Sequence, residues 1–76
     1  MENWRNRISI KPDVHNGDPC IAGTRVPVAV LVGSVADGDS IDQILTSWPQ
    51  LAREDVQAAL RFAAEAVSNF DVLPLS

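Results

Sequence analysis

The chain has 76 residues, of which 46% are hydrophobic, and its formal net charge is −4. This length allows a single domain with a small core, and the apolar content excludes an intrinsically disordered chain. Residues 26–76 contain two basic and seven acidic residues. An acidic body of this kind is a poor nucleic-acid binder by itself, because phosphate neutralisation supplies most non-specific affinity, and it suits a basic protein partner.

The compartment is indicated by three absences in the sequence. The longest apolar run, residues 26–32, is too short to span a bilayer. The polar N-terminus leads into no signal peptide. Cys20 is the only cysteine, so no internal disulfide can form. We therefore expect a cytoplasmic protein with no membrane association.

The first 26 residues are expected to form a flexible N-terminus (1–6) followed by a β-arm with a Gly/Pro loop (7–26). Residues 7–11 alternate polar and apolar side chains, which is typical of a half-buried strand, and Pro12 ends that strand. A short second strand is expected from residues 20–21 and 24–26, with Gly23 at the bend.

The stretch from residue 17 to residue 28 has a tightly specified backbone. It combines two glycines, which reach backbone angles that other residues avoid, with two prolines, whose φ angle is fixed. We interpret it as a structural turn whose signature residues are Gly17, Pro19, Gly23, Thr24, Arg25 and Pro27.

Three helices are expected within residues 27–70. The first is ambiguous, because its many β-branched residues favour a strand. Pro27 at a first helical position and Gly38 just beyond a run of helical length favour a helix instead, and we predict a helix. Ser40 and Gln43 form a capping box at the start of the second helix, which Pro49 ends.

The third helix begins with Glu54 and Asp55, which suit the positive end of the helix dipole. Its apolar face is predicted to comprise Val56, Ala59, Leu60, Ala63, Val67 and Phe70, with Gln57, Arg61, Glu65 and Ser68 on the opposite face. The last two helices are expected to be short. The predicted fold is therefore mainly α, with a short N-terminal β-element and a three-helix, helix-turn-helix-like (homeodomain-like) bundle.

Residues 71–76 form an apolar C-terminal tail without helical periodicity, which we expect to dock on the domain or on a partner. Trp4 lies outside the predicted elements, and an exposed tryptophan is typical of contact sites. The candidate partner-binding residues are Trp4, Phe70, Val72, Leu73 and Leu75.

DNA contacts are a further possibility, since helix-turn-helix proteins read bases with the start of the second helix. Here that position carries Glu54 and Asp55, whose carboxylates would face phosphates. The candidate DNA contacts are therefore basic residues elsewhere: Arg5, Arg7, Lys11 and Arg25.

The sequence contains no complete set of catalytic or metal-binding residues that we recognise. Cys20 and His15 share a loop and could form an activated nucleophile, but no third group orients them. One cysteine and one histidine cannot close a zinc tetrahedron. Asp37 could open a calcium loop, but the twelfth position of that loop would be Trp48 rather than glutamate. We expect no catalytic residue, metal, cofactor or small-molecule substrate.

Five segments resemble a family of small bacterial proteins known as domain of unknown function 433. They are Arg-Ile-Ser-Ile-Lys-Pro-Asp-Val (7–14), Gly-Asp-Pro-Cys-Ile-Ala-Gly-Thr-Arg-Val-Pro-Val (17–28), Ala-Asp-Gly-Asp-Ser (36–40), Pro49 and Glu-Asp-Val-Gln-Ala-Ala-Leu (54–60). Where the family commonly has Thr or Ser before the last helix, this chain has Ala52, and losing such a cap costs about 1 kcal/mol.

The resemblance implies a role as well as a fold. Family members often resemble the antitoxin of a toxin–antitoxin pair whose toxin resembles a PIN-domain ribonuclease. The leading hypothesis is thus an antitoxin-like protein that binds and neutralises such a toxin. Two alternatives remain open: a DNA-binding (auto)regulator that acts as a homodimer, and a structural, self-associating module.

Overall fold

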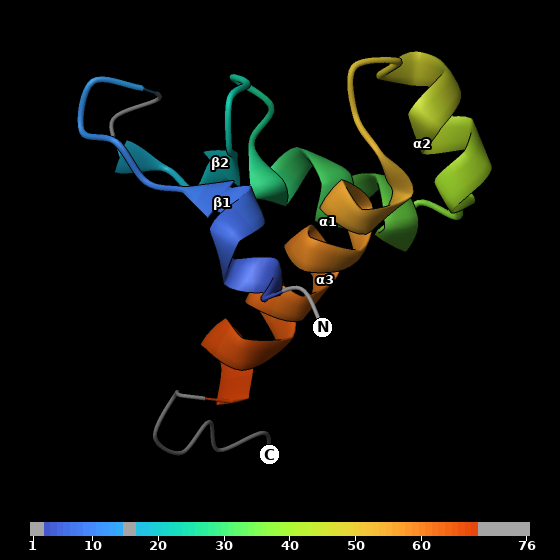
Figure 1. The fold of residues 1–76 in the computed structure, drawn as a ribbon. Helices are drawn as coiled ribbons and strands as arrows, with labels where there is room; N and C mark the ends of the chain where they lie inside the picture. The colour runs from blue at the N-terminus through green and yellow to red at the C-terminus, as the bar shows by residue number, and fades with distance from the viewer. Residues whose placement is uncertain (1–2, 15–16, 69–76) are drawn as a thin grey trace.

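The computed structural model of the protein describes residues 3–14 and 17–68. In chain order it contains the 3-10 helix η1 (Trp4–Arg7), strands β1 (Ile8–Ser9) and β2 (Cys20–Ile21), and helices α1 (Val28–Ala36), α2 (Ile41–Ser47) and α3 (Arg53–Ser68). Figure 1 shows the β-arm at the opposite side of the molecule from α2. Helix α3 packs against η1, α1 and α2 and so connects the two sides. The prediction of a mainly helical domain with three helices and a short β-element is confirmed.

The β-arm is shorter than predicted. Strands β1 and β2 pair antiparallel, with Ile8 opposite Ile21 and Ser9 opposite Cys20. The predicted strand over residues 7–11 therefore has only two paired residues. The predicted continuation at residues 24–26 is a turn, with a single bridge between Cys20 and Pro27 beyond it.

The turn after β2 is closed by one side chain. The Thr24 hydroxyl donates to the carbonyl of Ile21 at 2.8 Å and accepts from the amide of Val26 at 3.1 Å. Gly23 has a φ angle of 79°, and no atom lies within 4 Å of the position that a Cβ would take. Glycine is therefore favoured here by backbone conformation rather than by lack of space.

Helix α1 forms despite its β-branched residues, as predicted. Val28 and Leu31 are buried in the core, and this packing outweighs the local strand preference. One detail differs, because Pro27 has extended backbone angles and occupies the N-cap position rather than the first helical position. Gly38, with a φ angle of 99°, follows the end of the helix.

The capping box of α2 is confirmed. The Ser40 hydroxyl accepts from the amide of Gln43 at 3.1 Å, and the Gln43 side chain accepts from the amide of Ser40 at 2.7 Å. The helix ends at Ser47, ahead of Pro49, as expected.

Helix α3 is 16 residues long and is not the short helix that we expected. Val56 and Ala59 are buried as predicted, whereas Val67, also assigned to the apolar face, is 61% exposed. The reason is length: α1 has 9 residues, so at about 1.5 Å per residue it covers only part of α3. Phe70 lies outside the described residues.

The core lies where the β-arm and the three helices meet. Its buried members come from β2, the turn after it, the three helices and the loop before α3: Ile21, Val26, Val28, Leu31, Ile44, Leu51, Val56 and Ala59. No helix of the described part of the chain is long and apolar enough to cross a membrane.

The helix η1 begins at Trp4, within the segment 1–6 that we expected to be flexible. The Asn3 side chain accepts from the amide of Arg5 at 3.0 Å and caps η1. Two arginines of this short helix then reach carboxylates on α3. These long-range contacts stabilise a segment that has no local signal of its own.

Candidate interaction surface

A groove of about 350 Å³ lies between η1, β1 and the second half of α3. Its walls are mostly apolar, and it is lined by Trp4, Arg5, Ile8, Ile10, Phe62, Glu65 and Ala66. It forms where α3 extends beyond α1, so that only η1 and the β-arm accompany this half of the helix. We refer to it below as the η1–α3 groove.

Arg7 anchors the η1 wall of the groove. Its guanidinium donates to Asp55 Oδ1 at 2.9 Å, and the two side chains are 26% and 13% exposed. Asp55 Oδ2 also accepts from the amide of Ala52 at 2.9 Å. Asp55 thus contributes half of a capping box to α3, in which Ala52 cannot supply the other half, and it holds η1 at the same time.

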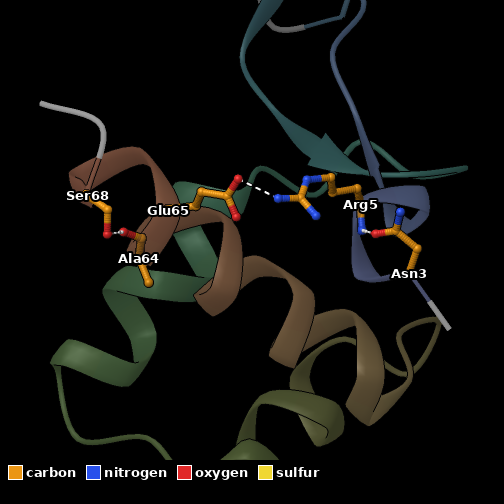
Figure 2. A network of polar contacts seen from close by, with 5 residues as sticks. All are labelled: Asn3, Arg5, Ala64, Glu65 and Ser68. Carbon is orange, nitrogen blue, oxygen red and sulfur yellow. Dashed lines mark hydrogen bonds and ion pairs between the residues drawn. The ribbon is translucent and has the colours of Figure 1, made fainter. Parts of the chain in front are cut away.

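Arg5 reaches across the groove and forms an ion pair that is more exposed than that of Arg7. Its guanidinium donates to Glu65 Oε1 at 2.5 Å, and the side chains are 56% and 41% exposed. The guanidinium carbon also lies 4.6 Å from the ring centre of Trp4, within the range of a cation–π contact. Figure 2 shows Arg5 projecting from η1 towards Glu65 on α3. The groove therefore carries one positive and one negative charge, side by side.

One large apolar residue of the groove is exposed. Ile10, which lines it, is 59% exposed. Val67 on α3 is exposed to a similar degree but is not a lining residue. Trp4, which we predicted to meet a partner, is half-buried in the wall. The other predicted partner-binding residues, Phe70, Val72, Leu73 and Leu75, lie outside the described residues.

The four candidate DNA contacts are distributed over three places. Arg5 and Arg7 are engaged with carboxylates of α3. Lys11 follows β1 and Arg25 lies in the turn after β2, and both are exposed. A phosphate contact by either arginine of η1 would require an existing ion pair to break.

Exposed carboxylates lie at the other side of the molecule, in the α1–α2 connection and at the start of α2. Asp37, Asp39 and Asp42 are exposed, and Asp42 pairs with Arg53 at the start of α3. Within the described residues, no three acidic, histidine or cysteine side chains are placed to hold a metal ion. We refer to Asp37, Asp39 and Asp42 as the acidic turn.

Cys20 is 1% exposed, and its thiol donates to the carbonyl of Asp18 at 3.5 Å. A buried thiol offers no access to a substrate. His15, its candidate partner, lies outside the described residues.

The sequence did not indicate the groove. Phe62 was not part of the predicted apolar face, and Glu65 was assigned to the solvent-facing side of α3. Arg5 and Glu65 are 60 residues apart, so no local pattern connects them. The only usable signal was the tryptophan at position 4, ahead of every predicted element.

The fold and the groove define a small three-helix domain with a two-stranded β-arm. The chain belongs to the family described as "Protein of unknown function (DUF433)", whose model matches residues 8–63. The predicted family resemblance is thereby confirmed.

Two relatives carry the same fold or sequence pattern. The chain is 39% identical over 59 residues to "Uncharacterized protein y4eO" of Sinorhizobium fredii, and the match covers 78% of this chain but only 27% of that protein. It also resembles the crystal structure of a DUF433 member from Anabaena variabilis, with a TM-score of 0.78 and 33% identity over 84% of this chain and 63% of the other. The domain therefore occurs within longer chains.

Proposed function

We propose that the protein is a non-enzymatic, antitoxin-like binding protein that neutralises a ribonuclease-like toxin by covering its RNA-binding surface. The observation that carries this proposal is the charge of the helical body. Residues 26–76 contain seven acidic and two basic residues, and the acidic turn is exposed.

The charge argument concerns the partner. An enzyme that binds RNA presents basic groups to the phosphates, because phosphate contacts dominate nucleic-acid affinity. An acidic protein surface is complementary to the same groups. It would compete with RNA for them and would also accelerate association by electrostatic steering.

The test is co-expression with the product of the neighbouring open reading frame, followed by co-purification and an assay of RNA cleavage. We expect Asp37→Lys/Asp39→Lys to weaken the complex about tenfold or more, with the largest difference at low salt. The matched control is Asp13→Lys/Asp18→Lys, which changes charge equally on exposed residues of the β-arm loop and should bind nearly as the wild type does.

Two results would contradict the proposal. One is a neighbouring product that cleaves no RNA and does not co-purify. The other is a complex that both double variants weaken equally, because then only net charge matters and the acidic turn has no particular role.

DNA-binding autoregulation is the second candidate, supported by the exposed positions of Lys11 and Arg25. Each phosphate contact that a Lys→Ala or Arg→Ala change removes should lower the slope of log affinity against log salt by about one. Lys11→Ala/Arg25→Ala should therefore flatten the salt dependence of operator binding. An unchanged slope would remove the support for this candidate.

A further inference from the structure

We propose that the η1–α3 groove is the interface through which two copies of this chain form a twofold-symmetric dimer. The inference is independent of the proposed function, which uses the acidic turn. It rests on the charge arrangement of the groove, on its shape and on the exposed apolar residues beside it.

The charges of the groove are self-complementary. Among the described residues that line the groove, Arg5 and Glu65 are the charged ones, one of each sign, and they lie 2.5 Å apart. In a twofold interface the same patch is present on both subunits. If residue i of one subunit contacts residue j of the other, then residue j of the first also contacts residue i of the second. Arg5 of each copy would then face Glu65 of the other, in an alternating ring of four charges. Charge networks of this kind stabilise more than isolated exposed pairs do.

The groove is also a face where two such copies repel little. Each chain has a net charge of −4, and copies of equal charge repel over most orientations. The described residues that line the groove have no net charge. A basic partner would gain little electrostatic attraction at this groove, and an identical copy would meet little electrostatic repulsion there.

The shape of the surface combines a hollow with a projection. The hollow is lined by the half-buried residues Trp4, Ile8 and Phe62, and Ile10 is the exposed large apolar residue among the described lining residues. In the proposed dimer we expect Ile10 of each copy to pack against the apolar hollow of the other. Burial of such apolar surface is the main driving force of association.

A small domain gains from such an interface, because a chain of 76 residues buries a smaller share of its surface than a larger one. Figure 2 shows that Glu65 and Arg5 lie on different elements, α3 and η1, so both walls of the groove would take part in the contact.

The decisive experiment mixes two charge-reversed variants. In Arg5→Glu all four ring positions are acidic, and in Glu65→Arg all four are basic, so each variant alone should dimerise about tenfold or more weakly than the wild type. In a 1:1 mixture both contacts between the subunits again join an arginine to a glutamate, one with the native signs and one with the signs exchanged. The mixture should therefore sediment as a heterodimer. A contact made only within one chain would not be restored by mixing.

The chain offers matched controls. Arg53 and Asp42 form another exposed ion pair, so Arg53→Asp and Asp42→Arg should each dimerise as the wild type does. Ile10→Asp should abolish the dimer, whereas Val30→Asp, on an exposed apolar residue of α1, should not. Far-ultraviolet circular dichroism establishes that each variant is folded.

Three outcomes would overturn the inference. The wild type could sediment as a monomer at the highest concentration that stays soluble. The single charge variants could dimerise normally, which would place the interface elsewhere. The mixture could stay monomeric although the wild type dimerises, which would mean that Arg5 and Glu65 do not meet across the subunits.

Discussion

Arg5 and Arg7 stand two residues apart in η1, and each reaches a carboxylate on α3, yet the two contacts differ in kind. The Arg7–Asp55 pair is largely buried, and Asp55 also holds the first turn of α3 through the amide of Ala52. The Arg5–Glu65 pair is mostly exposed and has no such second link among the described contacts of Glu65. The comparison indicates that the Arg7–Asp55 pair stabilises the fold, whereas the Arg5–Glu65 pair is a surface contact.

Burial decides this division. An exposed ion pair contributes about 0–1 kcal/mol, because water screens both charges. Removing one partner of a buried pair is more costly, since the remaining charge is left without compensation. The fold should therefore depend little on the exposed pair of Arg5 and Glu65 and more strongly on the largely buried pair of Arg7 and Asp55.

The strongest test of the comparison is Asp55→Ala. It leaves the half-buried guanidinium of Arg7 without this carboxylate and the amide of Ala52 without its acceptor. We expect the free energy of unfolding to fall by about 2–3 kcal/mol, measured by urea denaturation. Glu54→Ala, at the exposed neighbouring position, is the control and should stay within about 0.5 kcal/mol of the wild type. Equal losses of unfolding free energy for Asp55→Ala and Glu54→Ala would contradict the distinction between a buried, stabilising ion pair and an exposed one.

Arg7→Ala should cost less, about 1–2 kcal/mol, because Asp55 retains its bond to the amide of Ala52. A double-mutant cycle with Asp55→Ala isolates the pair itself. We expect a coupling of about 1 kcal/mol, since residues in direct contact are not additive. Additive effects would show that Asp55 acts on the helix end alone.

Ala52→Ser should sharpen the helix-end part of the comparison. Asp55 already supplies one half of a capping box, and a serine hydroxyl would add the acceptor that α2 has in Ser40. We expect a gain of about 0.5 kcal/mol in urea denaturation. Ala52→Val, which adds bulk without an acceptor, is the control. A gain with valine as well would point to packing rather than capping.

Arg5→Ala should have the smallest effect on folding. Its ion pair is exposed, so the unfolding free energy should change by less than about 0.5 kcal/mol at a protein concentration low enough to exclude association. A loss of unfolding free energy comparable to that of Arg7→Ala would mean that the two arginines stabilise the fold equally.

Features with local causes could be predicted from the sequence. Ser40 and Gln43 are three residues apart, so their capping box is visible in the chain itself. Pro27 and Gly38 bracket α1 and outweigh its β-branched composition. The family, its three helices and the β-arm followed from patterns of this range.

The rest depends on contacts between distant residues. Arg7 and Asp55 are 48 residues apart and Arg5 and Glu65 are 60 apart, so neither η1 nor the groove has a local signature. Val67 continues the apolar periodicity of α3, but the periodicity does not reveal that α1 ends before reaching it. The groove arises from that difference in helix length, which only the assembled fold shows.

Because Cys20 is buried, its rate of chemical labelling can be used to measure local opening of the β-arm. Its side chain is shielded from solvent and its thiol donates to the carbonyl of Asp18, and the chain has no other thiol. An alkylating reagent can reach the thiol only when the structure around β2 opens, so the labelling rate reports on that local opening.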